Sequence, residues 1–167
     1  GQGQLRLGRL LLVGRGLMGK LSGDAAVTNP ERTVRVTTVS AQFAVTPALA
    51  LGAALEARRT ETDVDVTVWR LIGAAVRFAP SFGVPGLAGL VDVRYFPMVT
   101  LPVGVVEKMS MALEADLGVS YTAPGSGLSV NVGYRLERFD FSAVGTAPAR
   151  LEQVSGLTVG VGWRLGR

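Results

Sequence analysis

The chain has 167 residues, which suits one domain of substantial size. It contains no cysteine and no histidine, which excludes a disulfide framework and a thiolate nucleophile, and removes the usual general base at neutral pH. A net charge of +4 is compatible with nucleic-acid binding, but the arginines are scattered along the chain and alternate with carboxylates, so we expect no nucleic-acid partner.

Hydrophobic residues make up 48% of the chain, yet they form no uninterrupted run of the length that a transmembrane helix needs. Two explanations remain: a large soluble core, or a membrane barrel whose apolar residues occupy alternate positions. The start of the chain shows no clear signal-peptide cleavage site, so we expect the mature form if the protein is exported.

Apolar and polar residues alternate over most of the chain, which predicts β-strands. The first segment, 4–21, is the least regular, and we interpret it as one strand. In the second, 32–45, the apolar parity changes, which predicts a bulge near Thr37 or Thr38. The eight predicted strands are 4–21, 32–45, 49–58, 64–79, 87–96, 108–121, 128–141 and 151–166.

The segment 108–121 carries the most regular pattern. Apolar side chains occupy the odd positions from Met109 to Tyr121, over a length that exceeds the 5–6 residues usual in a strand and suffices to cross a bilayer. Apart from Glu114 and Asp116, the even positions hold Gly, Ala and Ser, which fit the narrow interior of a small closed barrel. We therefore interpret the apolar face as facing lipid and the polar face as facing a lumen.

Short, turn-forming connections join these strands, for example near Pro47, Phe82 and Gly125. An even number of strands in meandering order predicts an all-β fold, an eight-stranded antiparallel up-and-down transmembrane β-barrel, in a single domain covering 1–167. In this arrangement both termini and the three turns named above lie on the periplasmic side.

Charged residues on the inward parity form the candidate site. Because eight strands enclose an interior that side chains just fill, we expect these charges to pair and occlude the lumen. A narrow or gated ion path is the functional alternative, and acid–base catalysis by Glu114 and Asp116 is a less economical one than ion pairing. The predicted charge network consists of Glu56, Arg58, Asp65, Arg77, Asp92, Arg94, Glu114, Asp116, Arg135, Glu137 and Arg164.

The outward parity carries aromatic residues and three arginines. We interpret Tyr95, Tyr121, Tyr134 and Trp163 as interfacial aromatics near strand ends, and the parity change at Phe139 and Phe141 as an aromatic girdle or a further bulge. Arginine near the bilayer centre costs about 2–4 kcal/mol. Three arginines interrupt the lipid-side parity and should therefore lie near head groups or at a protein contact: Arg9, Arg15 and Arg70.

The chain ends in Gly160-Val161-Gly162-Trp163-Arg164-Leu165, which resembles the C-terminal assembly signal of bacterial outer-membrane proteins. The stretches FAVTPALALGAALEAR and YTAPGSGLSVNVGYRLER look like the periplasmic hairpins of small OmpA/OmpX-type barrels. This resemblance implies an outer membrane of the Gram-negative type, with outer-membrane lipid, the barrel assembly machinery and a further envelope protein as partners. It also implies that Gly160, Trp163 and Leu165 act as an assembly signal.

We therefore expect a non-enzymatic outer-membrane barrel with a structural, anchoring or partner-docking role, without catalytic residues, cofactor or metal. Two alternatives stay open. One is a small pore or channel. The other is a soluble lipocalin-like barrel, in which the apolar face lines a cavity for a hydrophobic ligand.

Overall fold

The computed structural model describes residues 2–21, 32–61, 66–100, 108–125, 128–145 and 148–163. Within these ranges no helix has the length and apolar content needed to cross a membrane. Nine strands form one antiparallel sheet in which each strand pairs with its neighbours in the chain. They are β1 (Gln2–Leu7), β2 (Leu10–Leu21), β3 (Arg32–Ala44), β4 (Leu49–Glu61), β5 (Val66–Phe78), β6 (Leu87–Thr100), β7 (Lys108–Thr122), β8 (Leu128–Ser142) and β9 (Arg150–Trp163).

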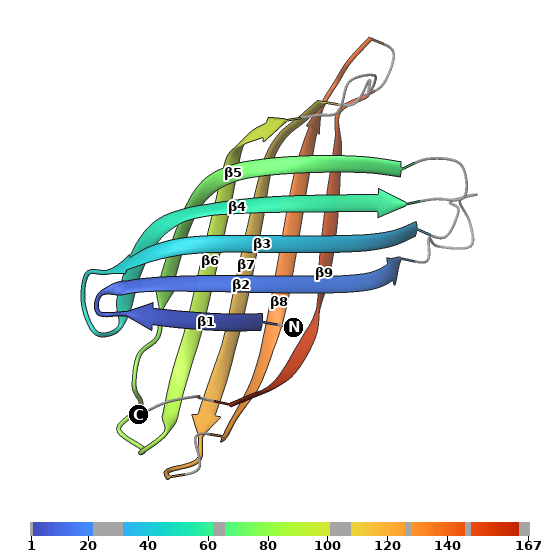
Figure 1. Ribbon diagram of the computed structural model, residues 1–167. Coiled ribbons are helices and arrows are strands. Elements are labelled where there is room, and N and C mark those ends of the chain that lie inside the picture. Colours follow the sequence, from blue (N-terminus) through green and yellow to red (C-terminus); the bar gives the residue numbers. More distant parts are fainter. Residues whose placement is uncertain are drawn as a thin grey trace.

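The sheet curls over on itself into a half-barrel. Figure 1 shows β1–β5 lying side by side across the front of the molecule, with β6–β9 running behind them at a steep angle. The sheet is open, because β1 and β9, the first and last of the described strands, do not pair with each other. The predicted all-β, antiparallel, up-and-down topology is confirmed, whereas the structure has nine strands and an open seam in place of eight strands and closure.

The additional strand comes from the segment predicted as a single strand over 4–21, and that prediction is wrong. The chain reverses at Gly8 and Arg9, so that Leu7 pairs with Leu10. Gly8 has a φ of 60°, a conformation that favours glycine. Because the chain folds back there, the apolar parity restarts after the turn, which explains the irregular pattern. β1 begins opposite Arg15, midway along β2.

The irregularities of the sheet lie elsewhere than predicted. The ladders that join β3 to β2 and β4 run without a shift past Thr37 and Thr38, so the predicted bulge there is wrong. Register shifts occur instead between Ile72 and Ala74 and between Met109 and Met111. The second shift places Met109 in the core, on the face opposite to the one its odd position predicts.

A hydrophobic cluster fills one part of the concave face. Phe139 and Phe141 belong to it and are buried, which corrects the prediction of an aromatic girdle, whereas a register shift does lie opposite Phe141, between Met109 and Met111 of β7. The rings of Phe141 and Trp69 meet edge to face, with centroids 5.4 Å apart. The buried members of this aromatic cluster are Ala54, Trp69, Leu71, Ala75, Phe96, Met109, Ala112, Phe139 and Phe141. It joins residues from β4 to β8 and closes that part of the interior.

Candidate functional site: a buried charge network

Ten charged side chains occupy the middle of the concave face, and we call them the charge network. Five are arginines and five are carboxylates, so the formal charge of the network is zero. They come from β2 and from β4 to β8, because inward residues recur at every second position of a strand. Its members are Arg15, Glu56, Arg58, Arg77, Asp92, Arg94, Glu114, Asp116, Arg135 and Glu137.

Arg94 lies among three carboxylates. Its Nη2 is 3.0 Å from Oδ1 of Asp92, and its Nη1 is 3.1 Å from Oε2 of Glu114 and 3.4 Å from Oδ2 of Asp116. Glu114 is fully buried and also lies 3.4 Å from Nη2 of Arg135. Since buried charges are retained where partners compensate for their desolvation, this arrangement explains how the carboxylates remain in the interior.

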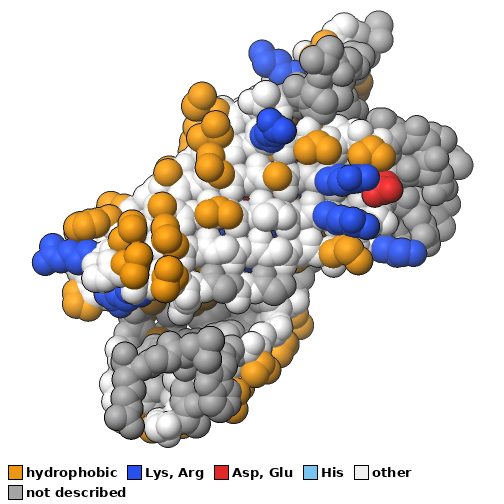
Figure 2. Space-filling model, viewed as in Figure 1, with side chains coloured by type: hydrophobic (Ala, Val, Ile, Leu, Met, Phe, Trp, Pro, Cys, Tyr) orange, Lys and Arg blue, Asp and Glu red, His pale blue; other side chains and the backbone are white. Residues whose placement is uncertain are grey.

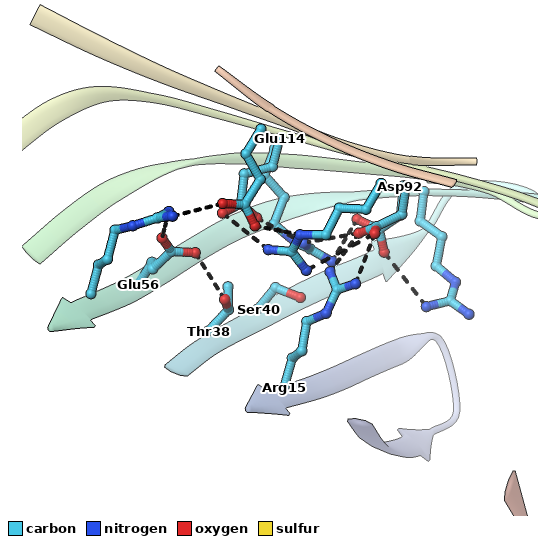
Figure 3. A network of polar contacts seen from close by, with 12 residues as sticks. Arg15, Thr38, Ser40, Glu56, Asp92 and Glu114 are labelled. Atoms are coloured by element: carbon cyan, nitrogen blue, oxygen red, sulfur yellow. Dashed lines mark hydrogen bonds and ion pairs between the residues drawn. The ribbon is translucent and has the colours of Figure 1, made fainter. Parts of the chain in front are cut away.

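Two ion pairs connect the front strands of the half-barrel to those behind. Arg15 of β2 donates from Nη2 to Oδ1 of Asp116 on β7 at 2.7 Å, and its Nη1 contacts the other carboxylate oxygen. Arg58 of β4 donates to Glu137 of β8 at 2.8 Å. Figure 3 shows Arg15, Glu56, Asp92 and Glu114 converging on one region from different strands. These ion pairs hold the curled sheet together across its interior, in addition to the backbone hydrogen bonds between neighbouring strands.

Neighbouring side chains extend the network on both sides. The Thr38 hydroxyl donates to Oε2 of Glu56 at 2.9 Å, and the Arg58 guanidinium lies over the Phe139 ring, 4.1 Å from its centroid. At the other side Nη1 of Arg77 lies 3.6 Å from Oδ2 of Asp92. The network is therefore continuous with the aromatic cluster at Phe139.

The structure brings together nine of the eleven residues predicted for this site. Eight of these nine are buried, and Arg77 is partly exposed. The other two, Asp65 and Arg164, lie outside the described residues. Arg15 was expected on the lipid side, which is wrong, because its side chain faces Asp116. The strand register shows that Arg15 faces inward. Arg15 pairs with Thr38, which lies on the same buried polar face of β3 as Ser40.

Glu114 and Asp116 both lie in ion pairs. Each contacts two arginines or more, as the ion-pairing interpretation expects. Among the described residues no group of three or more Asp and Glu side chains is placed to hold a metal ion. The arrangement is suited to filling and stiffening the interior.

The convex face has the opposite character. Large apolar side chains from every strand are exposed on it, and Figure 2 shows them spread over the front strands. On β4 the convex positions from Leu49 to Ala57 are apolar, and on β8 so are those from Leu128 to Leu136. We call this surface the apolar band.

Basic residues border the apolar band at one end of the sheet, where β2, β4 and β8 end and β3 and β5 begin. Arg70 pairs with Ala57, two residues before Arg59 on β4, and is exposed; its expected place near head groups or at a protein contact stays a prediction. Arg9 is exposed in the turn at the opposite end. The exposed members of the first group, which we call the basic rim, are Lys20, Arg35, Arg59, Arg70 and Arg138.

The predicted interfacial aromatics share the convex face but not one level. Tyr95, Tyr121 and Tyr134 are all exposed. Tyr121 is next to the end of β7, whereas Tyr134 lies near the middle of β8, so the expected position near a strand end applies to Tyr121. The side chain of Trp163, which ends β9, lies outside the described residues.

The residues predicted as an assembly signal are described only in part. Gly160 lies in β9 and pairs with Asn131, whereas Leu165 lies outside the described residues. Comparison of the chain with protein-family models, curated proteins and solved structures finds no match. The geometry of the two faces therefore carries the functional assignment.

Proposed function

We propose that this protein is a non-enzymatic membrane β-barrel of the bacterial outer membrane, with a structural or anchoring role. The observation that carries the proposal is the inversion of the two faces: charges are buried on the concave face and large apolar side chains are exposed on the convex one. Soluble monomers rarely expose contiguous apolar patches of more than a few hundred Å². In lipid the same surface is matched to its surroundings.

The height of the apolar band supports this proposal. On β8 it runs over nine residues, Leu128 to Leu136, which span about 30 Å at ~3.3 Å per residue. A tilt of about 40° reduces this to ~23 Å, close to the apolar height of about 25 Å in outer-membrane barrels. The basic rim then lies at the level of the head groups, where arginine costs little.

The filled interior supports a structural role over the alternatives. The charges of the network are paired with one another and the aromatic cluster is packed beside them, which argues against a pore. A lipocalin-like protein requires an apolar concave face, whereas the centre of this one carries ten charged side chains. We propose that lipid, the barrel assembly machinery and a further envelope protein docked on the outer wall are the partners.

The proposal is tested by adding urea-unfolded protein to vesicles of dilauroylphosphatidylcholine and floating them in a density gradient. We expect the protein to float, to resist alkaline extraction, and to change its mobility in SDS electrophoresis when boiled. Full solubility without lipid or detergent, with no change on boiling, would contradict the proposal. Stepwise conductance in planar bilayers would favour the pore.

A further inference from the structure

The open seam of the half-barrel has two sides that are compatible in direction. One side is β9, which pairs only with β8 among the described strands. The other is the far half of β2, because β1 pairs with β2 only from Leu10 to Arg15. Each successive pair in the sheet is antiparallel, so a pair formed by β9 and β2 would also be antiparallel.

Residues of both strands line one cavity. A cavity of about 170 Å³ lies between them, lined by Leu17 and Gly19 on one side and by β9 from Val154 to Thr158 on the other. Among the large apolar side chains that the structure describes, those of Leu157, Val159 and Val161 on β9 are the most exposed, with Leu157 at 83%, and no other described strand covers the free edge of β9. Natural proteins normally cover an exposed edge strand of this kind.

The two faces are also compatible. In β2 the odd positions face the concave side, as the Arg15 contact shows; in β9 the even ones do, because Gly156 pairs with the buried Arg135. Antiparallel pairing of an odd residue of β2 with an even residue of β9 keeps every side chain on its present face. Gly19 and Gly156 leave open space around the position of a Cβ, so the backbones can approach.

We propose that in the membrane β9 pairs with β2 and closes the sheet into a barrel of eight long strands, and that β1 leaves the edge of β2 when this happens. The inference rests on the proposed membrane location. An unpaired backbone amide or carbonyl costs several kcal/mol in hydrocarbon, so an open strand edge does not persist there. β1 pairs with only six of the twelve residues of β2, whereas β9, with fourteen residues, is long enough to pair with all of them.

The competing occupant of the β9 edge is β9 of a second copy. Closure within the chain is favoured because β2 already lines the same cavity, whereas a second chain must be recruited from solution. In addition, dimerisation through β9 leaves the edge of β2 unprotected in lipid.

Engineered disulfides test the proposal without interference, because the chain has no cysteine of its own. Two variants report on closure: Leu17→Cys with Gly156→Cys, and Gly19→Cys with Gly156→Cys, whose registers differ by two residues. A third, Leu5→Cys with Leu12→Cys, joins residues that pair in β1 and β2. Opposed residues in an antiparallel pair have Cα atoms within disulfide distance.

Each variant is oxidised after insertion into dilauroylphosphatidylcholine vesicles and recovery of the floating fraction. We expect most of the protein in one of the two closure variants to form an intramolecular disulfide, and the third variant to remain reduced. The variant Val132→Cys with Val159→Cys, which joins paired residues of β8 and β9, is the positive control for oxidation.

Floating protein in which neither closure variant forms a disulfide, or in which Leu5→Cys and Leu12→Cys become linked, overturns the closure and leaves the proposed function intact. Disulfide-linked dimers of a Gly156→Cys single variant overturn it in favour of pairing between copies. If no variant floats, the proposed function fails, and closure fails with it.

Discussion

At the scale of single residues, Arg94 is the most informative position of the charge network. Its replacement by methionine keeps much of the side-chain volume and removes the cation that lies among Asp92, Glu114 and Asp116. Three carboxylates then lose a partner in the interior. We expect Arg94→Met to lower the free energy of unfolding in micelles by about 3–5 kcal/mol, as for a broken buried ion pair.

The matched control is Arg138→Met. Arg138 forms an ion pair with Asp140 at 3.2 Å, but its side chain is 46% exposed. Exposed pairs contribute about 0–1 kcal/mol, so urea titration should show a small change for this variant. Similar losses for both substitutions would mean that the network does not stabilise the fold as a buried ion-pair cluster.

Residue parity was sufficient to select most of the network from the sequence. Nine of the eleven predicted members are on the concave face, because a strand alternates its two faces and the polar set of 108–121 is unambiguous. Arg15 was misplaced because the odd positions around it are apolar. The pairing of Arg15 with Thr38 of β3 shows that these apolar residues face inward. This pairing could not be predicted, because the sequence of one segment does not fix its register against a neighbouring strand.

At the scale of elements, Gly73 lies at the register shift between β5 and β6. A Cβ at this position would lie 1.9 Å from the carbonyl oxygen of Tyr95, next to the register shift that follows Ile72. Backbone cannot yield as a flexible side chain does, so we expect Gly73→Ala to lower the free energy of unfolding by about 1–3 kcal/mol or more. The measurement is the urea midpoint in micelles.

Gly14→Ala is the control for that experiment, since nothing lies within 4 Å of a Cβ built there. It should change the stability by no more than about 0.5 kcal/mol in either direction, as surface substitutions usually do. A stable Gly73→Ala variant with an unchanged midpoint would mean that the close approach at Tyr95 is not required.

Strand existence was predictable at most places, and strand number was not. Alternation identified the segments that became β3 to β9, but a hairpin with a two-residue turn resembles one irregular strand when both of its arms are apolar. The bulge at Met109 could not be predicted from the sequence. The register shift moves this side chain to the other face of the sheet, but the alternation of apolar and polar residues shows no break there.

At the scale of the whole molecule, the proposed function depends on whether the convex face meets lipid or water. Val132 lies in the middle of the apolar band on β8 and is exposed. We expect Val132→Arg to destabilise the vesicle-inserted protein by about 2–4 kcal/mol, the cost of arginine at the bilayer midplane. Thr100→Arg, at the end of β6 beside Arg70, should cost about 0–1 kcal/mol.

Both variants are compared by reversible urea unfolding from dilauroylphosphatidylcholine vesicles. In a protein whose convex face meets water, both substitutions would be surface changes within about 0.5 kcal/mol of neutral. Equal and small effects would therefore contradict the membrane location. A loss confined to Val132→Arg would support it.

The two-residue connection at Gly8 and Arg9 also sets an order in time. The hairpin of β1 and β2 is complete within the first 21 residues, whereas β9 begins at Arg150. Local pairing closes a short loop and forms quickly, while distant pairing waits for the intervening chain. We therefore expect β1 to pair with part of the β2 edge before any distant strand reaches it, and to shield that part from pairing with other chains.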